Sequence, residues 1–172
     1  MRHATISSTK TTPTDRRGCM SRLRAYARRL QRPYLGAGML FWSRDEEGQT
    51  WVVLGRRAYR HGLGYREWSL PGGGYEDYDG STLDTAVRES REEIHWKVGD
   101  LSRVRPLYSI RCLMFRFDIY EYELKERVPL HRPCSEFSQV RWFRADQLPI
   151  DTLFLARIEV GYLLKRLKRE IL

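Results

Sequence analysis

The sequence predicts a single α/β layered domain in which β-strands pack against two helices. Two observations lead to this prediction. A length of 172 residues suits one domain with a substantial core. Short apolar, β-prone segments are interspersed with two segments of helical periodicity at separate places in the chain, which is typical of a layered α/β arrangement. No apolar run approaches the ~18 to 20 residues that a membrane helix needs, so we expect no membrane-spanning segment.

The strands are expected to begin with a hairpin. The segments expected to form strands are residues 34–42, 50–56, 68–71, 104–112, 113–123 and 139–143. The polar stretch 43–49, which contains Gly48, separates the first two strands and favours a hairpin turn. Pro71 restricts Leu70 to extended geometry and leads into Gly72-Gly73-Gly74. We expect these glycines to end the strand tightly, because glycine adopts backbone angles that other residues avoid.

The clearest predicted helix spans residues 81–96. Ser81 can cap it, and Asp84 three residues later completes a capping-box pattern. The positions expected to share the face that packs on the sheet are Leu83, Ala86, Val87, Ser90 and Ile94. A final helix is expected after Pro149, opening at Asp151. Its apolar stripe is predicted to contain Leu153, Ala156, Val160, Leu163, Leu167 and Ile171.

The basic charge of the chain is concentrated at its N-terminus. The formal net charge is +9, and residues 1–33 hold nine of the 31 Lys and Arg residues but one of the 22 acidic residues. The remainder is close to neutral, which argues against a basic nucleic-acid face on the domain itself. We expect residues 1–33 to form a flexible basic arm and residues 34–172 the folded domain. A short basic helix over residues 20–32 is the alternative to a solvated segment there.

Residues 1–19 leave three interpretations open. They partly fit an organelle transit peptide, which is rich in Arg and Ser and poor in acids. They also fit a flexible arm, or a leader that precedes a true start at Met20.

The three cysteines, Cys19, Cys112 and Cys134, form no Cys-x-x-Cys pair, so neither a zinc knuckle nor a disulfide framework is indicated. A reducing, cytoplasmic compartment is the simpler interpretation.

Three glutamates carry the strongest chemical signal. Glu89, Glu92 and Glu93 stand at positions i, i+3 and i+4, so their carboxylates share one face of the predicted helix. Such a run alone predicts a solvated acidic face, because charge runs usually lie on the surface. The glycine segment just before the helix changes this interpretation, since its backbone can approach a ligand closely. A group of oxygen ligands beside it suits Mg²⁺ or Mn²⁺. The four histidines are scattered and form no competing metal set.

The glycine segment and the glutamates together resemble the motif of the Nudix hydrolase family. The two matching stretches are LPGGGYE at residues 70–76 and AVRESREE at residues 86–93. The family motif is Gly, five residues, Glu, seven residues, then Arg-Glu-U-x-Glu-Glu-x-Gly-U, where U is a bulky aliphatic residue. The resemblance covers about residues 34–170. It implies the Nudix-like α/β/α sandwich, in which a mixed β-sheet lies between helices.

The resemblance also implies roles for individual residues. Glu89, Glu92 and Glu93 would hold the divalent ions, with the backbone carbonyl of Gly73 as a further ligand, and Arg88 would orient the glutamates. The general base would be Glu89 or Glu136, a plain loop glutamate being the alternative for Glu136. The residues expected to bind substrate are Arg56, Trp68 and Tyr75. Trp68 and Tyr75 would stack a base, with core or hairpin packing as their alternative use.

The chain departs from the motif at the upstream acid. Counted from Gly73, the acid position falls on Asp79, and eight residues rather than seven then precede Arg88. Counted back from Arg88, the same position falls on Gly80. Either a shorter acid with one inserted residue serves there, or the acid is missing.

Two further departures lie on the helix. Ser90 replaces the aliphatic residue, and His95 replaces the glycine that normally ends the helix. We therefore expect the helix to run on toward Gly99.

The resemblance implies a divalent-metal-dependent hydrolase that cleaves the diphosphate linkage of a nucleoside diphosphate derivative or a nucleotide. RNA 5′-pyrophosphohydrolysis is one alternative, because residues 136–143 are similar to that class and the basic arm would contact phosphates. A non-hydrolytic nucleotide-sensing domain is another, because of the departures from the motif. The sequence leaves the oligomeric state open, a homodimer included.

Overall fold

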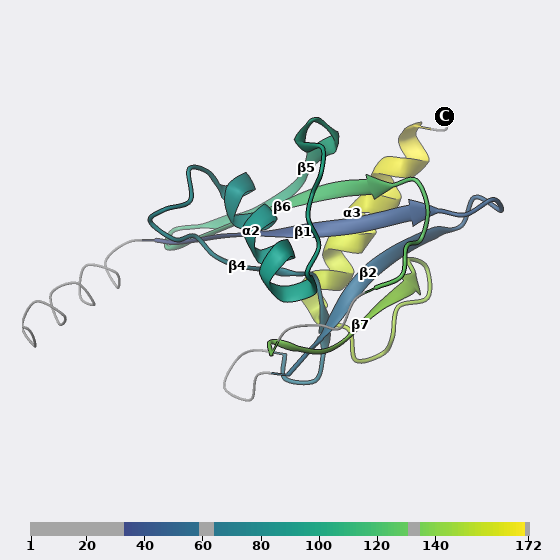
Figure 1. The fold of residues 1–172 in the computed structure, drawn as a ribbon, viewed down its shortest axis with the longest axis horizontal. Coiled ribbons are helices and arrows are strands. Elements are labelled where there is room, and N and C mark those ends of the chain that lie inside the picture. The colour runs from purple at the N-terminus through teal and green to yellow at the C-terminus, as the bar shows by residue number, and fades with distance from the viewer. Residues whose placement is uncertain (1–32, 59–63, 131–134, 171–172) are drawn as a thin grey trace, which may run out of the picture. The chain divides into compact units, whose positions relative to one another are not determined.

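A computed structural model of the protein describes residues 33–58, 64–130 and 135–170. Its strands are β1 (Tyr34–Arg44), β2 (Thr50–Arg57), β3 (Trp68–Ser69), β4 (Gly72–Gly74), β5 (Val104–Cys112), β6 (Phe115–Leu124) and β7 (Phe137–Arg144). Its helices are α2 (Thr82–Ile94), a single 3₁₀ turn (Leu101–Arg103) and α3 (Phe154–Glu170) (Figure 1). The predicted segment 20–32 and the residues Cys19, Cys134 and Ile171 lie outside the described residues.

The strands form one mixed sheet in the order β3-β2-β1-β6-β5, with β4 paired to β1 and β7 paired to β2. β1 and β6 are parallel, and the other pairs are antiparallel. The predicted β1–β2 hairpin is confirmed, but it pairs only over residues 42–44 of β1. Residues 36–38 of β1 pair with β4 instead. The same edge of β1 therefore has two different partners along its length.

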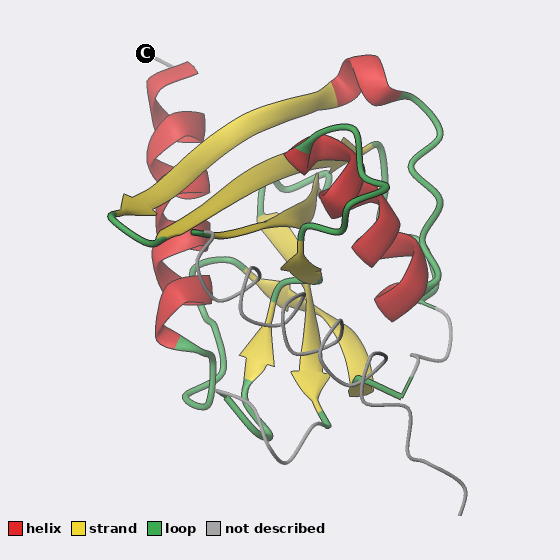
Figure 2. Ribbon diagram, turned by 90° about the vertical axis from the view of Figure 1, so that its left-hand side faces the viewer, coloured by secondary structure: helices red, strands yellow, loops and turns green. Residues whose placement is uncertain are grey.

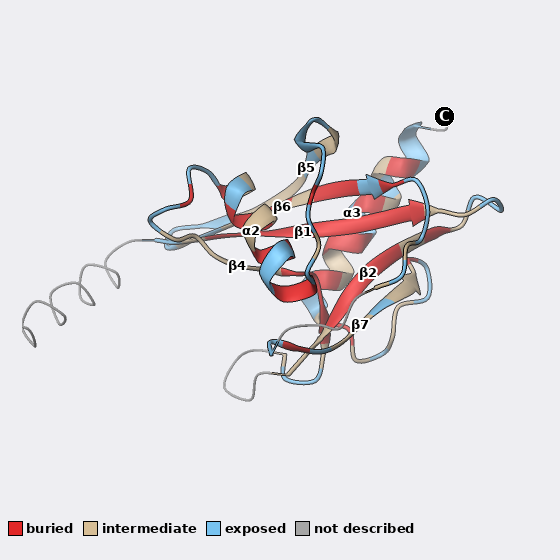
Figure 3. Ribbon diagram, viewed as in Figure 1, coloured by how far each residue is buried: buried red, intermediate tan, exposed pale blue. Residues whose placement is uncertain are grey.

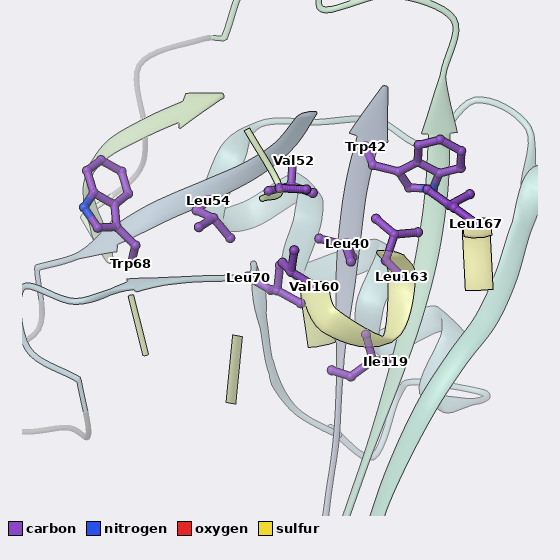
Figure 4. Packing of buried hydrophobic residues seen from close by; sticks show 11 residues of the cluster. Leu40, Trp42, Val52, Leu54, Trp68, Leu70, Ile119, Val160, Leu163 and Leu167 are labelled. Carbon is purple, nitrogen blue, oxygen red and sulfur yellow. The ribbon is translucent and has the colours of Figure 1, made fainter. Parts of the chain in front are cut away.

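The two helices cover opposite faces of the sheet (Figure 2). Successive side chains of a strand point to opposite faces, and β1 is buried over most of its length (Figure 3). On the α2 side, Met39 and Phe41 belong to the same core cluster as Ala86 of α2. On the α3 side, the core residues shown in Figure 4 are Leu40, Trp42, Val52, Leu54, Trp68, Leu70, Ile119, Val160, Leu163 and Leu167. This arrangement confirms the predicted α/β/α sandwich with a mixed sheet.

Helix α2 begins as predicted but ends earlier. The side chain of Ser81 accepts a hydrogen bond from the Asp84 N–H. The expected continuation toward Gly99 is wrong, because His95 adopts the left-handed conformation with a φ of 54°. The N–H of Trp96 then donates to the carbonyl of Ser90 at 3.0 Å, which closes the helix. His95 thus takes the terminating conformation that a glycine usually supplies.

Helix α3 begins at Phe154, three residues after the predicted start at Asp151. The preceding residues extend beside β3 instead: the N–H of Trp68 donates to the Asp151 carbonyl, and the N–H of Leu153 donates to the Trp68 carbonyl, both at 2.9 Å. The predicted stripe is confirmed at Ala156, Val160, Leu163 and Leu167, all of which are buried. Among the described residues, no helix is long and apolar enough to cross a membrane.

Residues 72–74 form strand β4, which corrects the expected tight turn. Gly72, Gly73 and Gly74 pair antiparallel with residues 38, 37 and 36 of β1. A Cβ added at Gly72 would lie 2.6 Å from the backbone carbonyl oxygen of Ala37. Glycine is needed here because β4 approaches its neighbours closely, and none of the three has a positive φ.

Glu159 of α3 gives the stability of the fold a dependence on pH. The residue is 5% exposed, and burial raises the pKa of its carboxyl to about 7. The folded state then holds this proton more tightly than the unfolded chain, so the contribution of Glu159 to stability falls as pH rises from the ordinary glutamate pKa to about 7 and is level above it. We expect Glu159→Gln to remove this fall and to stabilise the protein at pH 8 by roughly 2–4 kcal/mol.

Urea unfolding at pH 5 and pH 8 measures this effect. Glu126→Gln, at an exposed position, is the control and should shift neither value. Equal behaviour of the two variants at both pH values contradicts the prediction.

Candidate functional site

Helix α2 places two buried glutamates against β4. The N–H of Gly72 donates to Oε2 of Glu93 at 2.7 Å. A Cβ added at Gly73 would collide with the carboxylate of Glu89. Glu89 and Glu93 are 9% and 2% exposed. The glycine strand therefore makes room for two carboxylates that lie directly on its backbone.

Burial dominates the electrostatics of these two carboxylates. Burial raises the pKa of Glu93 to about 9, with the charges of Glu89 and Glu136 acting in the same direction and the Gly72 N–H and Arg57 opposing them. Burial also raises the pKa of Glu89, against the stabilising effect of Arg88. The site thus gathers negative charge that the surrounding protein only partly compensates, which is the environment that a bound cation stabilises.

A cavity of about 210 Å³ opens beside Glu93. Its lining residues are Arg57 at the end of β2, Glu93, Glu136 and Phe137 at the start of β7. The N–H of Ala58 donates to the carbonyl of Glu136 at 2.8 Å, which ties the two strands together at this point. The structure therefore brings Glu136, which the sequence analysis proposed as a base, to the same cavity as Glu93.

Arg88 links the glutamates to the loop before α2. Its guanidinium donates to both carboxylate oxygens of Asp79 at 3.1 Å and to the carbonyl of Gly74 at 2.8 Å. It also donates to Glu89 Oε1 at 2.8 Å and to Glu92 Oε2 at 3.0 Å. These contacts fix the position of Arg88 and, through it, the carboxylate of Glu89.

Asp79, one of the two candidates for the upstream position of the motif, is the residue that Arg88 contacts. Asp79 is 6% exposed, and it also accepts hydrogen bonds from the Thr85 hydroxyl at 2.9 Å and from the Glu76 N–H at 3.0 Å. Burial alone would raise the pKa of Asp79, but these bonds and the Arg88 guanidinium hold it below its ordinary value.

The N-terminus of α2 is fixed to the sheet by a second polar contact. The hydroxyl of Thr82 donates to Asp118 of β6 at 2.8 Å, and Asp118 also accepts from Ser109 of β5 at 2.6 Å. Asp118 is 6% exposed. Both ends of the glutamate-bearing helix are thus anchored, one at β6 and β5 and the other through Glu93 at β4.

Glu92 differs from the other two glutamates of the motif. Its side chain is 56% exposed and pairs with Arg88. Within residues 33–58, 64–130 and 135–170, no three Asp, Glu, His or Cys side chains are grouped as a ready metal-binding set. The carboxylates of Glu89 and Glu93 contact the β4 backbone, whereas the Glu92 side chain is largely exposed to solvent.

Two of the residues expected to bind substrate, Arg56 and Trp68, make their contacts on the α3 side of the sheet. Arg56 donates to the Arg66 carbonyl at 3.0 Å and pairs with Asp151 at 3.3 Å. Trp68 is 5% exposed and packs edge-on against Phe143 in the α3-side core.

Tyr75 has a structural role in the loop before α2. It is half-buried, and its hydroxyl donates to the carbonyl of Asp79. Its N–H donates to the Leu35 carbonyl at 2.8 Å, so Tyr75 supports the loop that carries the acid.

Arg57 is the residue that the sequence analysis missed. It lines the cavity with Glu93 and Glu136, whereas the preceding Arg56 faces the side of α3. Strand alternation puts residue 57 on the same side of β2 as Val53, the α2 side, but both sides of β2 are apolar and the sequence alone does not show which side faces the cavity.

The comparisons with known proteins agree with this fold. The family model of the NUDIX domain matches residues 34–164. The NUDIX domain of Shewanella oneidensis NrtR, solved with ADP ribose, is 20% identical with a TM-score of 0.63, covering 78% of this chain and 88% of that one. A Caenorhabditis elegans Ap4A hydrolase, solved as a binary complex, is 14% identical with a TM-score of 0.54, covering 78% and 98%.

A third structure is longer than this chain. A MutT/nudix family protein of Enterococcus faecalis is 22% identical with a TM-score of 0.57, covering 76% of this chain and 52% of that one. The chain therefore spans about half the length of that relative. No curated protein matches the sequence.

Proposed function

The chain belongs to the Nudix family, and from this premise we propose that it is a divalent-metal-dependent hydrolase that cleaves the diphosphate linkage of a nucleoside diphosphate derivative or a nucleotide. Membership of the Nudix family supports the general assignment as a nucleotide or pyrophosphate hydrolase. The observation that carries the finer proposal is the pair of buried carboxylates, Glu89 and Glu93, held on the glycine backbone of β4 beside a cavity.

The residues present fit Mg²⁺ or Mn²⁺. The side-chain atoms proposed to bind the metal ions are all carboxylate oxygens, the type of ligand that these ions prefer. We propose that Glu89, Glu92 and Glu93 hold the ions together with the carbonyl of Gly73. When bound, the ion neutralises charge that develops on the diphosphate oxygens and lowers the pKa of a bound water.

The remaining residues of the site divide the other tasks. Arg57 is placed to bind a phosphate oxygen, because its guanidinium faces the same cavity as Glu93 and Glu136. We propose Glu136 or Glu89 as the group that takes the proton of the attacking water. Arg88 positions Glu89 through the hydrogen bond between them and does not need to touch the substrate.

A substrate screen of the full chain tests the proposal. We expect release of phosphate, after coupling to a phosphatase, from at least one nucleoside diphosphate derivative or nucleotide when Mg²⁺ or Mn²⁺ is present. Removing the metal with excess EDTA should abolish this release, because the carboxylates alone cannot neutralise the developing charge.

The substrate screen includes triphosphorylated RNA, and nucleotide binding is measured separately by calorimetry. Turnover confined to RNA would favour the 5′-pyrophosphohydrolase alternative. Nucleotide binding without any product, in either metal, contradicts the proposal and favours a sensing domain.

A further inference from the structure

Helix α3 is apolar on two sides. One side packs on the sheet and is buried in the α3-side core. The other side, which we call the outer surface of α3, carries four apolar residues at helical spacing: Phe154, Leu155, Ile158 and Tyr162. Phe154 is 73% exposed, and Tyr162 is 44% exposed. Ile150, in the loop that leads into the helix, is 98% exposed and adds a further apolar side chain near its start.

Apolar residues on both sides are characteristic of a helix that is also covered on both sides. Helix α2 shows the usual alternative, because its exposed residues Asp84, Arg91 and Glu92 are all charged. A large apolar side chain such as Phe154 in water forgoes the free energy that its burial would release. Neighbouring exposed apolar residues on α3 therefore mark a surface that contacts another molecule.

The C-terminal half of the outer surface is basic. Lys165, Lys168 and Arg169 are exposed, and they follow the four apolar residues along the helix. The acids of the described part of α3 do not compensate this charge, because Glu159 is buried and Glu170 is bonded to an arginine of the same helix at 2.6 Å. The outer surface thus combines an apolar half with a half of uncompensated positive charge.

An anionic lipid surface fits both halves of the outer surface. Exposed aromatic and aliphatic side chains enter the boundary between headgroups and acyl chains, and lysine and arginine side chains attract negatively charged headgroups. A second copy of the chain fits less well, because the described part of this surface offers no unpaired acid to the basic half of its counterpart. Such lipid binding is peripheral and needs no spanning helix.

We propose that the outer surface of α3, together with Ile150, is a docking surface for an anionic membrane. The apolar half enters the lipid boundary, and the basic half contacts the phosphate headgroups. The two helices cover opposite faces of the sheet, so the carboxylates carried by α2 stay accessible when α3 lies on a membrane (Figure 2). The docking does not depend on the hydrolysis proposed above.

Sedimentation of the full chain with vesicles measures this docking. We expect the wild type to bind vesicles of equal parts phosphatidylcholine and phosphatidylserine, and not vesicles of phosphatidylcholine alone. Phe154→Ser and Ile150→Ser should each lower the partition coefficient about tenfold, because each removes an apolar side chain from the lipid boundary. Tyr78→Ser is the matched control, since Tyr78 is 74% exposed but lies in the loop before α2, and should change the coefficient by less than about twofold.

The basic half is tested with Lys168→Gln, which should lower binding to the anionic vesicles about fivefold. Arg91→Gln removes one exposed positive charge from α2 instead and is the control, with an expected change of less than about twofold. Residues 1–33 hold nine Lys and Arg residues and are present in every variant. If that segment alone bound the vesicles, Phe154→Ser and Ile150→Ser would bind like the wild type, and this result overturns the inference.

Other results also overturn the inference: no binding of the wild type to either kind of vesicle, equal binding to both kinds, or equal losses for Phe154→Ser and Tyr78→Ser. Sedimentation velocity without vesicles tests the second copy as the occupant. A wild-type dimer that Phe154→Ser converts to a monomer assigns the outer surface to self-association and overturns the membrane proposal. None of these measurements uses a substrate, so a chain that cleaves no diphosphate can still support the inference.

Discussion

Replacing Glu93 by glutamine is expected to lower metal-dependent turnover roughly a thousandfold while the fold stays intact. Glutamine keeps an oxygen that can accept the hydrogen bond from the Gly72 N–H, so the contact between α2 and β4 is retained. It removes the negative charge that the proposed ions need. Because burial disfavours the charged carboxylate in the apo protein, the variant should be at least as stable as the wild type without metal.

Turnover of a substrate that the wild type cleaves, at saturating Mg²⁺ or Mn²⁺, measures this effect. Glu159→Gln is the matched control, since Glu159 is also a buried glutamate with a raised pKa but lies on α3. The control should keep full turnover. A Glu93→Gln protein that folds normally and retains full metal-dependent activity would remove the basis for the proposed function.

Replacing Arg88 by methionine is expected to destabilise the protein by about 3 kcal/mol or more. The guanidinium bonds both oxygens of Asp79 and one of Glu89, and these partners are 6% and 9% exposed. Removing it leaves two buried carboxylates without their main cationic partner. The effect is large because the cost is that of an uncompensated buried charge, not the value of a surface ion pair.

Urea unfolding at neutral pH measures this loss, and Arg91→Met supplies the control. Arg91 lies one turn along the same helix but is exposed, so its replacement should change the free energy of unfolding by less than about 0.5 kcal/mol. Adding Asp79→Asn to Arg88→Met should recover part of the stability, because it neutralises one of the stranded acids. Similar losses for Arg88→Met and Arg91→Met contradict the role assigned to Asp79.

Local sequence patterns predicted most of the elements, because they depend on neighbouring residues. The apolar, β-prone composition of residues 34–42 and the helical spacing in α2 predicted both elements, and Ser81 caps the helix as predicted. The end of α2 was predicted wrongly, because His95 accepts a left-handed conformation that the sequence pattern assigns to glycine. The hydrogen bond to the carbonyl of Ser90 fixes the end of α2 at His95, and it forms only where the chain leaves the helix.

Long-range pairing could not be predicted in the same way. The pairing of β4 with β1 depends on how closely two distant backbones approach, and three consecutive glycines are equally compatible with a turn. Arg56 and Arg57 illustrate a second difficulty. Both faces of β2 are apolar, with Leu54 on the α3 side and Val53 on the α2 side, so alternation alone does not say which arginine reaches the cavity.

Along one edge, β1 pairs with two different strands, and this main-chain pairing is independent of the side chains that line the cavity. β1 pairs with β4 near its beginning and with β2 near its end. Arg57 and Glu136 contribute side chains to the cavity beside Glu93. Substitutions at Arg57 or Glu136 are therefore expected to change which ligand the cavity accepts while the pairing of β4 with β1 is retained.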